Sequence, residues 1–187
     1  MRRPRLDLLR RTLPLAALLP VLAALGGCGG PGRDQFAPAC PEARPMPVAD
    51  HLRRYRTPNQ PDGRDVPDLE YTGLVVGVAG SCRNGGKPDE VDATLKVRLQ
   101  LDRGPAFPAG GVDVPYVVVV ASGSRILSRH TFSNHVVIPP ATPKVILTSD
   151  PIAIALPVKR AASAAGYTIW VGFNLTKDEF SAQSAGR

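Results

Sequence analysis

Three cysteines, Cys28, Cys40 and Cys82, have the most distinctive chemistry in this 187-residue chain. Cys28 follows two glycines, and small residues at that place are typical of a cleavage point after an export signal. With Cys28 set apart, Cys40 and Cys82 remain, and an even number of cysteines in an oxidising compartment favours a disulfide. Such a bond would close about 42 residues and, on the chain-entropy model, stabilise the fold by about 4 kcal/mol. The alternatives are two free thiols or a redox role, although no Cys-x-x-Cys spacing supports thioredoxin-like activity.

Histidines and carboxylates offer little for catalysis or metal binding in this sequence. His130 and His135 are five residues apart, which on one strand places them on opposite faces. Asp89-Glu90-Val91-Asp92 is better explained as an exposed acidic turn than as a catalytic carboxylate pair. The sequence also contains no Gly-x-Ser-x-Gly elbow, P-loop or Gly-rich dinucleotide turn. We therefore expect no catalytic residue, no metal and no cofactor.

The first 27 residues have the composition of a secretory signal. A basic head precedes the apolar stretch from Leu13 to Leu25, which as a helix would span only about 20 Å of a bilayer core of roughly 30 Å. Five arginines and one aspartate in this signal supply +4 of the formal charge of +7. The remaining +3 is ordinary for a soluble surface, so we expect no nucleic-acid partner.

The segment Leu25-Gly26-Gly27-Cys28 resembles the bacterial lipobox, in which a leucine stands three residues before the lipidated cysteine. The resemblance implies that Cys28 carries acyl chains such as palmitate, becomes the new N-terminus and anchors the chain in a membrane. Gly29 stands where an inner-membrane retention signal often has aspartate, which favours the outer membrane over the inner membrane. The alternative is an ordinary cleaved signal in which Cys28 has no role. We expect a lipid-anchored protein of the bacterial cell envelope that faces the periplasm.

Residues 28–68, a segment that begins with this cysteine, are predicted to form a Pro-rich tether. Eight prolines lie between Gly29 and Asp68, and the apolar residues there follow no helical or strand period. Pro-rich chains are extended and semi-rigid, which suits a spacer that holds a domain away from a membrane. Residues 48–55 have helical spacing of apolar side chains, so we expect a short helical turn or a segment docked on the sheet edge. A partner-binding segment is the alternative.

Residues 69–187 are predicted to form an all-β domain with a short C-terminal tail. Apolar and polar residues alternate strictly from Val91 to Leu101 and again from Tyr167 to Leu175, as in antiparallel strands with one solvent-facing side. Turn residues separate further expected strands at 70–80, 115–121, 125–132, 133–138, 144–149 and 152–158. Seven to eight short strands predict an antiparallel immunoglobulin-like β-sandwich, with a small β-barrel as the alternative.

Four local signals refine this prediction. Consecutive valines at 117–120 place that strand in the middle of a sheet, and Pro151 and Pro157 favour an edge position for the strand at 152–158. Tyr167 stands at the start of a late strand, where immunoglobulin-like sandwiches have a corner tyrosine. Thr176 and Glu179 have the spacing of a capping box, which predicts a short helical turn over 177–183.

Trp170 is the best single candidate for a partner contact. The alternation of its strand points it toward solvent, and an exposed tryptophan often marks an interface. The alternative is that the tether or the C-terminal tail covers it.

A further resemblance concerns most of the mature chain. It is carried by the lipobox with Cys28, by Cys40, by Arg103-Gly104-Pro105, and by the segment from Tyr167 to Glu179. Together these look like a group of small uncharacterised lipoproteins of proteobacterial type, which implies class and location but no mechanism. We expect a non-catalytic interaction or structural module of the envelope with a protein partner. The alternatives are a carrier of a hydrophobic or lipid-like ligand, and an enzyme with His130 beside Asp89 or Glu90 in a cleft.

Overall fold

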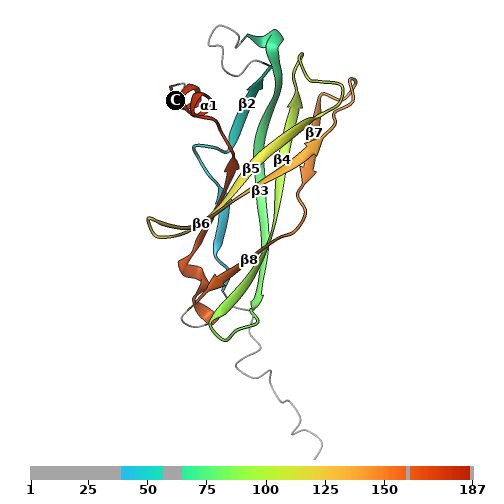
Figure 1. The fold of residues 1–187 in the computed structure, drawn as a ribbon. Helices are drawn as coiled ribbons and strands as arrows, with labels where there is room; N and C mark the ends of the chain where they lie inside the picture. The colour runs from blue at the N-terminus through green and yellow to red at the C-terminus, as the bar shows by residue number, and fades with distance from the viewer. Residues whose placement is uncertain (1–38, 57–64, 159–160, 186–187) are drawn as a thin grey trace, which may run out of the picture. The chain divides into compact units, whose positions relative to one another are not determined.

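The structure is a computed structural model that describes residues 39–56, 65–158 and 161–185 (Figure 1). The predicted signal, Cys28 and the first part of the predicted tether lie outside the described residues. A compact unit spans residues 37–187. Within the described ranges, no helix is both long enough and apolar enough to cross a membrane.

Nine strands account for most of the described residues. They are β1 (Glu42–Pro45), β2 (His51–Tyr55), β3 (Leu69–Asn84), β4 (Glu90–Arg103), β5 (Val112–Ser122), β6 (Arg125–Val136), β7 (Lys144–Thr148), β8 (Ile152–Pro157) and β9 (Thr168–Phe173). The helical elements in the described ranges are two 3-10 helices, η4 (Val66–Asp68) and η5 (Ala161–Gly166), and the C-terminal helix α1 (Lys177–Ala185).

The strands form two sheets that pack as a sandwich, which confirms the predicted all-β class. The first sheet has the order β1-β9-β5-β6, and the second has the order β2-β3-β4-β7 with β8 also pairing with β4. Neighbours are antiparallel except β1 and β9, which run parallel. No strand of one sheet pairs with a strand of the other over the described ranges, so the closed barrel is not the architecture.

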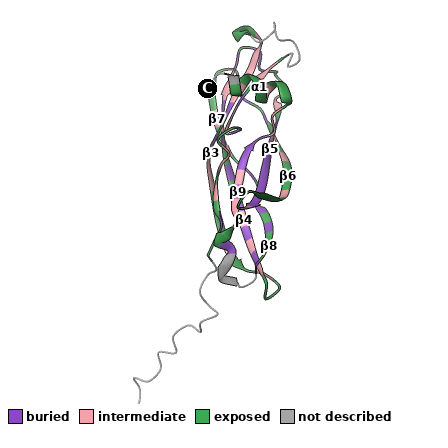
Figure 2. Cartoon of the chain, turned by 90° about the vertical axis from the view of Figure 1, so that its left-hand side faces the viewer, coloured by how far each residue is buried: buried purple, intermediate pink, exposed green. Residues whose placement is uncertain are grey.

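The core between the sheets follows the predicted alternation. β4 buries its six apolar residues from Val91 to Leu101 and turns the intervening polar residues outward. β5 and β9 face β4 with residues such as Val118, Ile169 and Val171, and Figure 2 colours long stretches of these strands as buried. Burial of each such side chain stabilises the fold by about 1.5–3 kcal/mol.

The sheet positions predicted for two strands are confirmed, and one strand prediction is corrected. β5 lies between β9 and β6, and β8 pairs with β4 alone among the described strands, as an edge strand does. The two strands expected at 125–132 and 133–138 are one strand, β6, because its backbone pairs with β5 from Arg125 to Val136. The predicted break at Ser133 is wrong because Ser133 pairs with Pro115 in an uninterrupted register.

The predicted domain start at residue 69 is too late. β1 and β2 come from the segment expected to be a tether, and each becomes an edge strand of one sheet. Residues 51–55 form a strand and not a helical turn, because pairing with β3 satisfies their backbone groups. Leu52 is fully buried there, so docking on the sheet edge is the correct alternative.

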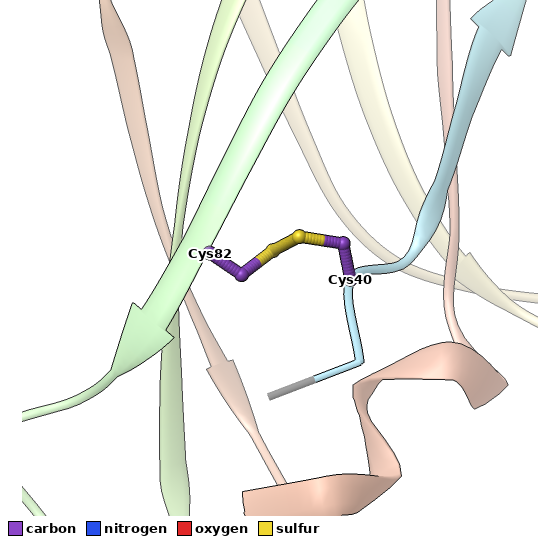
Figure 3. The surroundings of a disulfide bond; sticks show 2 residues. All are labelled: Cys40 and Cys82. Atoms are coloured by element: carbon purple, nitrogen blue, oxygen red, sulfur yellow. A yellow bond between two sulfur atoms is a disulfide. The ribbon is translucent and has the colours of Figure 1, made fainter. Parts of the chain in front are cut away.

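The predicted disulfide between Cys40 and Cys82 is confirmed (Figure 3). It joins the residues just before β1 to the end of β3, with the two Cα atoms 5.6 Å apart and 42 positions apart in the sequence. Because the bond closes a loop of that length, chain entropy assigns it about 4 kcal/mol of stabilisation. The bond fixes the place where the chain enters the folded unit.

Two predicted local motifs are present near the C-terminus. The Tyr167 hydroxyl donates to the Pro157 carbonyl, a bond back to an upstream strand of the kind that a corner tyrosine makes. The Thr176 amide donates to Glu179 Oε2 at 2.8 Å, and the Glu179 amide donates to Thr176 Oγ1 at 3.2 Å. This reciprocal pair is a capping box, and α1 begins at Lys177 as that motif requires.

A candidate binding groove on the outer face of the β5 sheet

An apolar groove of about 380 Å³ lies against the face of the first sheet that points away from the core. We call it the outer groove. Its lining residues are Met46, Val48, Ala49, Val117, Val119, Ile126, Arg129, Phe173, Leu175, Thr176, Lys177 and Phe180. They come from the β1–β2 connection, from β5 and β6, and from the stretch that runs from the last residue of β9 into the first turn of α1.

The floor of the outer groove is formed by two valines of β5. Val117 and Val119 alternate with the core residues of β5, so their side chains point to the opposite face of the sheet. Nevertheless only 4% and 7% of their surfaces are exposed, because the segments on either side rise above the sheet. An apolar floor that is already shielded from water is typical of a ligand-binding pocket.

The first wall is the connection between β1 and β2, residues 46–50, which crosses the outer face over Gly172. The Met46 amide donates to the Val171 carbonyl and the Phe173 amide donates to the Ala49 carbonyl, each at 2.7 Å. A Cβ on Gly172 would lie 2.9 Å from Ala49 Cβ, which is closer than real Cβ atoms approach one another. The missing side chain at Gly172 therefore lets this wall lie on the sheet.

The second wall is the C-terminal segment, which α1 holds against β2. Glu179 forms an ion pair with Arg54 Nε at 3.2 Å, and both side chains are largely buried. Gln183 donates through Nε2 to the His51 carbonyl at 2.8 Å, which places the helix beside β2 (Figure 1). These contacts hold Phe180, which lines the groove and is half-exposed.

A buried phenol lies beside the ion pair that holds the second wall. Tyr71 is almost entirely buried, and this burial raises the pKa of its phenol above the ordinary value. The neighbouring Arg54 guanidinium opposes that rise, because a positive charge favours the phenolate. The carboxylate that balances the positive charge of Arg54 is Glu179.

β6 closes the third side of the outer groove and adds one of its two cations. Ile126 is 67% exposed, and Arg129 donates through Nη2 to Asn174 Oδ1 at 2.9 Å. Arg129 and Trp170 are the two register partners of Val119, so the three residues form one row across β6, β5 and β9.

The lining combines nine apolar residues with only three polar ones, Arg129, Thr176 and Lys177. Neither cation lies within ion-pair distance of a carboxylate among the described residues, and the lining contains no acidic residue. Apolar walls with a few polar groups at one side are typical of sites that bind small organic molecules or apolar side chains.

Trp170 points outward, on the face that its strand alternation predicts. It is half-buried, and the Arg44 guanidinium lies over its ring at 4.3 Å from the centroid, in a cation–π contact. Arg44 belongs to β1, so part of the predicted tether covers this residue, as the alternative interpretation of Trp170 required. Trp170 is nevertheless next to the outer groove because it is paired with Val119.

The histidines and carboxylates that the sequence offers as catalytic or metal-binding candidates do not line the outer groove. His135 Nδ1 is 2.9 Å from Asp113 Oδ1, and this hydrogen bond raises the pKa of the exposed imidazole. Asp92 pairs with Arg83 at 3.2 Å, and Glu90 lies 3.9 Å from Lys87. In the described part of the chain, no three histidine, cysteine or acidic side chains are grouped as metal ligands would be.

The valine run of β5 indicates in the sequence that the groove floor is apolar, but it does not indicate what covers that face of the strand. Four consecutive valines at 117–120 mean that β5 is apolar on both faces, which predicts burial in mid-sheet. The structure adds the reason: one face packs in the core and the other is covered by the groove walls. Those walls come from residues 46–49 and 175–180, which are distant in the sequence and are predicted as tether, last strand and tail.

Known proteins give no guide to what the outer groove binds. No protein-family model, no curated protein and no solved structure matches the chain. What the groove can bind must be inferred from its lining, its volume and its charges.

Proposed function

We propose that the protein is a lipid-anchored lipoprotein of the bacterial cell envelope, facing the periplasm, that acts by binding and not by catalysis. The observation that carries the binding role is the outer groove, because nine of its twelve lining residues are apolar and several of them remain exposed. Exposed apolar surface of this kind costs free energy in water and is typical of an interaction site. An envelope protein that inserts an apolar side chain is the first candidate partner.

The anchor belongs to the same proposal and rests on Cys28. Its position after Leu25-Gly26-Gly27 is the lipobox pattern, and two or three acyl chains hold a protein firmly in a bilayer. Gly29 favours the outer membrane. The disulfide is consistent with an oxidising compartment such as the periplasm.

A carrier of a hydrophobic or lipid-like ligand is the second candidate function. The partly enclosed shape of the groove favours it, because a volume of about 380 Å³ falls within the roughly 300–1,000 Å³ of small-molecule sites. The two candidates share one site and differ in what enters it.

The anchor is tested by expressing the chain and a Cys28→Ala variant in a diderm bacterium with labelled palmitate. The wild-type protein should carry the label and sediment with outer-membrane vesicles in a density gradient. The Cys28→Ala variant should carry no label and be released from that fraction. Wild-type protein without label, or recovered from the cytoplasm, would overturn the anchored location.

The binding role is tested with two matched double variants. The groove variant, Ile126→Gln/Phe180→Gln, replaces two exposed lining residues. The control variant, Leu74→Gln/Ile146→Gln, replaces two residues of similar exposure on the outer face of the second sheet, where both align with Gln100. The protein or lipid recovered from solubilised envelopes with the wild type should be lost with the groove variant and kept with the control variant. Equal recovery with both variants would contradict the groove as the contact site.

A further inference from the structure

The charges around the outer groove identify the kind of molecule that fits it. Arg129 and Lys177 are exposed cations in a lining that is mostly apolar, and no described carboxylate pairs with either of them. Arg129 uses Nη2 to bind the Asn174 amide oxygen, a neutral acceptor that leaves its positive charge uncompensated. Two uncompensated cations favour an anionic group over a neutral one.

The volume and lining of the groove restrict what the uncharged part of the ligand can be. The side chains of Val117 and Val119 on the floor, and of Met46 and Leu175 on the walls, offer only apolar contacts. A volume of about 380 Å³ lies near the lower end of the range for ligand sites, so it suits one acyl chain better than two. Each methylene that the groove removes from water adds to the affinity, because apolar surface is transferred out of water.

We propose that the outer groove binds a single-chain anionic amphiphile, with its acyl chain along the valine floor and its anionic headgroup at Arg129 and Lys177. This inference rests on the proposed binding role of the groove and names the class of ligand. The ligand chemistry is that of a fatty acid: one hydrocarbon chain that ends in one negative charge. Arg129 lies directly beside Val119 in the sheet register, so the charged and apolar contacts are adjacent.

The test measures binding of three probes of equal chain length, dodecanoate, dodecanol and dodecyltrimethylammonium, below their micelle-forming concentrations. The protein is the mature chain from residue 28 with Cys28→Ser, which removes the acyl anchor and leaves the described residues unchanged. Binding is followed by calorimetry and by the fluorescence of Trp170, the single tryptophan, which pairs with Val119 of the groove floor. Dodecanoate should bind most tightly, dodecanol more weakly and the cationic probe most weakly.

Variants separate the apolar contribution from the charged one. The groove variant should weaken dodecanoate and dodecanol alike by about tenfold, and the control variant should weaken neither. A charge variant, Arg129→Gln/Lys177→Gln, should weaken dodecanoate by about fivefold and leave dodecanol unchanged, as expected for two exposed charge contacts. All substituted residues are exposed, and circular dichroism checks that each variant is folded.

The outcomes distinguish this inference from the proposed function. Equal affinity for all three probes, no binding of any probe, or a charge variant that binds dodecanoate like the wild type would overturn the anionic amphiphile. Suppose that the probes give one of these results, but the wild type captures an envelope protein that the groove variant does not capture. The binding role of the groove then stands, and its occupant is a protein. If the groove variant changes neither probe binding nor capture, both the inference and the proposed role are wrong.

Discussion

Gly172 illustrates how one residue determines the shape of the candidate site. It pairs with Val117 of the groove floor, and the backbone of residues 46–49 lies directly over it. A side chain there would separate the wall from the sheet and stretch the 2.7 Å bond from the Phe173 amide to the Ala49 carbonyl. The sequence pattern places Gly172 on the outer face of β9 but does not indicate that another segment covers it.

We predict that Gly172→Ala destabilises the fold by about 1–3 kcal/mol, the usual cost of overpacking. The measurement is the free energy of unfolding in urea. Gly77→Ala is the matched control, because a Cβ at Gly77 meets no atom within 4 Å and should change stability little. Equal losses of unfolding free energy in the two variants would show that the nearby Ala49 does not exclude a side chain at position 172.

A second prediction concerns the pKa of the His135 imidazole. Its hydrogen bond to Asp113 raises the pKa of the imidazole in the folded state, because the carboxylate favours the protonated ring. The pair therefore contributes to stability below the unfolded pKa of about 6.5, and this contribution is lost as pH rises through the higher folded pKa. An NMR titration should give His135 a higher midpoint than a free histidine, and Asp113→Asn should lower it. An unchanged midpoint in that variant would contradict the assignment.

At the scale of the element, α1 depends on one acidic residue with two roles. Glu179 closes the capping box with Thr176 through Oε2 and forms the ion pair with Arg54 through Oε1. One residue thus starts the helix and attaches it to β2. The capping box is visible in the sequence, whereas the ion pair is not, because Arg54 lies in a segment predicted to be outside the domain.

We predict that Glu179→Ala destabilises the protein by about 1–3 kcal/mol and loosens α1, since it leaves the largely buried Arg54 without its carboxylate. Hydrogen exchange over residues 177–184 measures the helix, and urea unfolding measures the whole fold. Asp178→Ala, an exposed change in the same turn, is the control and should leave both nearly unchanged. Slow exchange in the Glu179→Ala helix, equal to that of the wild type, would refute this role.

The elements that the sequence predicts best are those with strict alternation. β4 agrees with its predicted strand because buried apolar residues alternate with outward-facing polar ones, and β9 agrees because every second residue from Ile169 to Phe173 packs in the core. β1 and β2 are missed because they have only four and five residues, and prolines on either side hide their pattern. The groove is missed for the same reason, since one of its walls belongs to that segment.

For the molecule as a whole, the disulfide ties the residues just before β1 to the end of β3 in the sandwich. Cys40 follows Cys28 by twelve residues, a length that reaches at most about 40 Å. If Cys28 is the anchored residue, as we propose, the end of β3 that holds Cys82 lies within that distance of the bilayer surface.

We predict that Cys40→Ala/Cys82→Ala lowers the free energy of unfolding by about 4 kcal/mol, because the unfolded chain regains the freedom of a 42-residue loop. Chemical denaturation of the variant and of the wild type under oxidising conditions gives the difference. Reduction of the wild type should give the same loss. A stability equal to that of the oxidised wild type would mean that the cross-link adds nothing to the fold.

Photo-crosslinking in intact cells tests whether the outer groove is the contact site, as we propose. A photoreactive residue replaces Ile126 in one variant and Ile146, which has similar exposure on the other sheet, in a second variant. We predict a discrete lipid or protein adduct after irradiation at position 126 and none at position 146. The same adducts from both positions, or none from position 126, would contradict it.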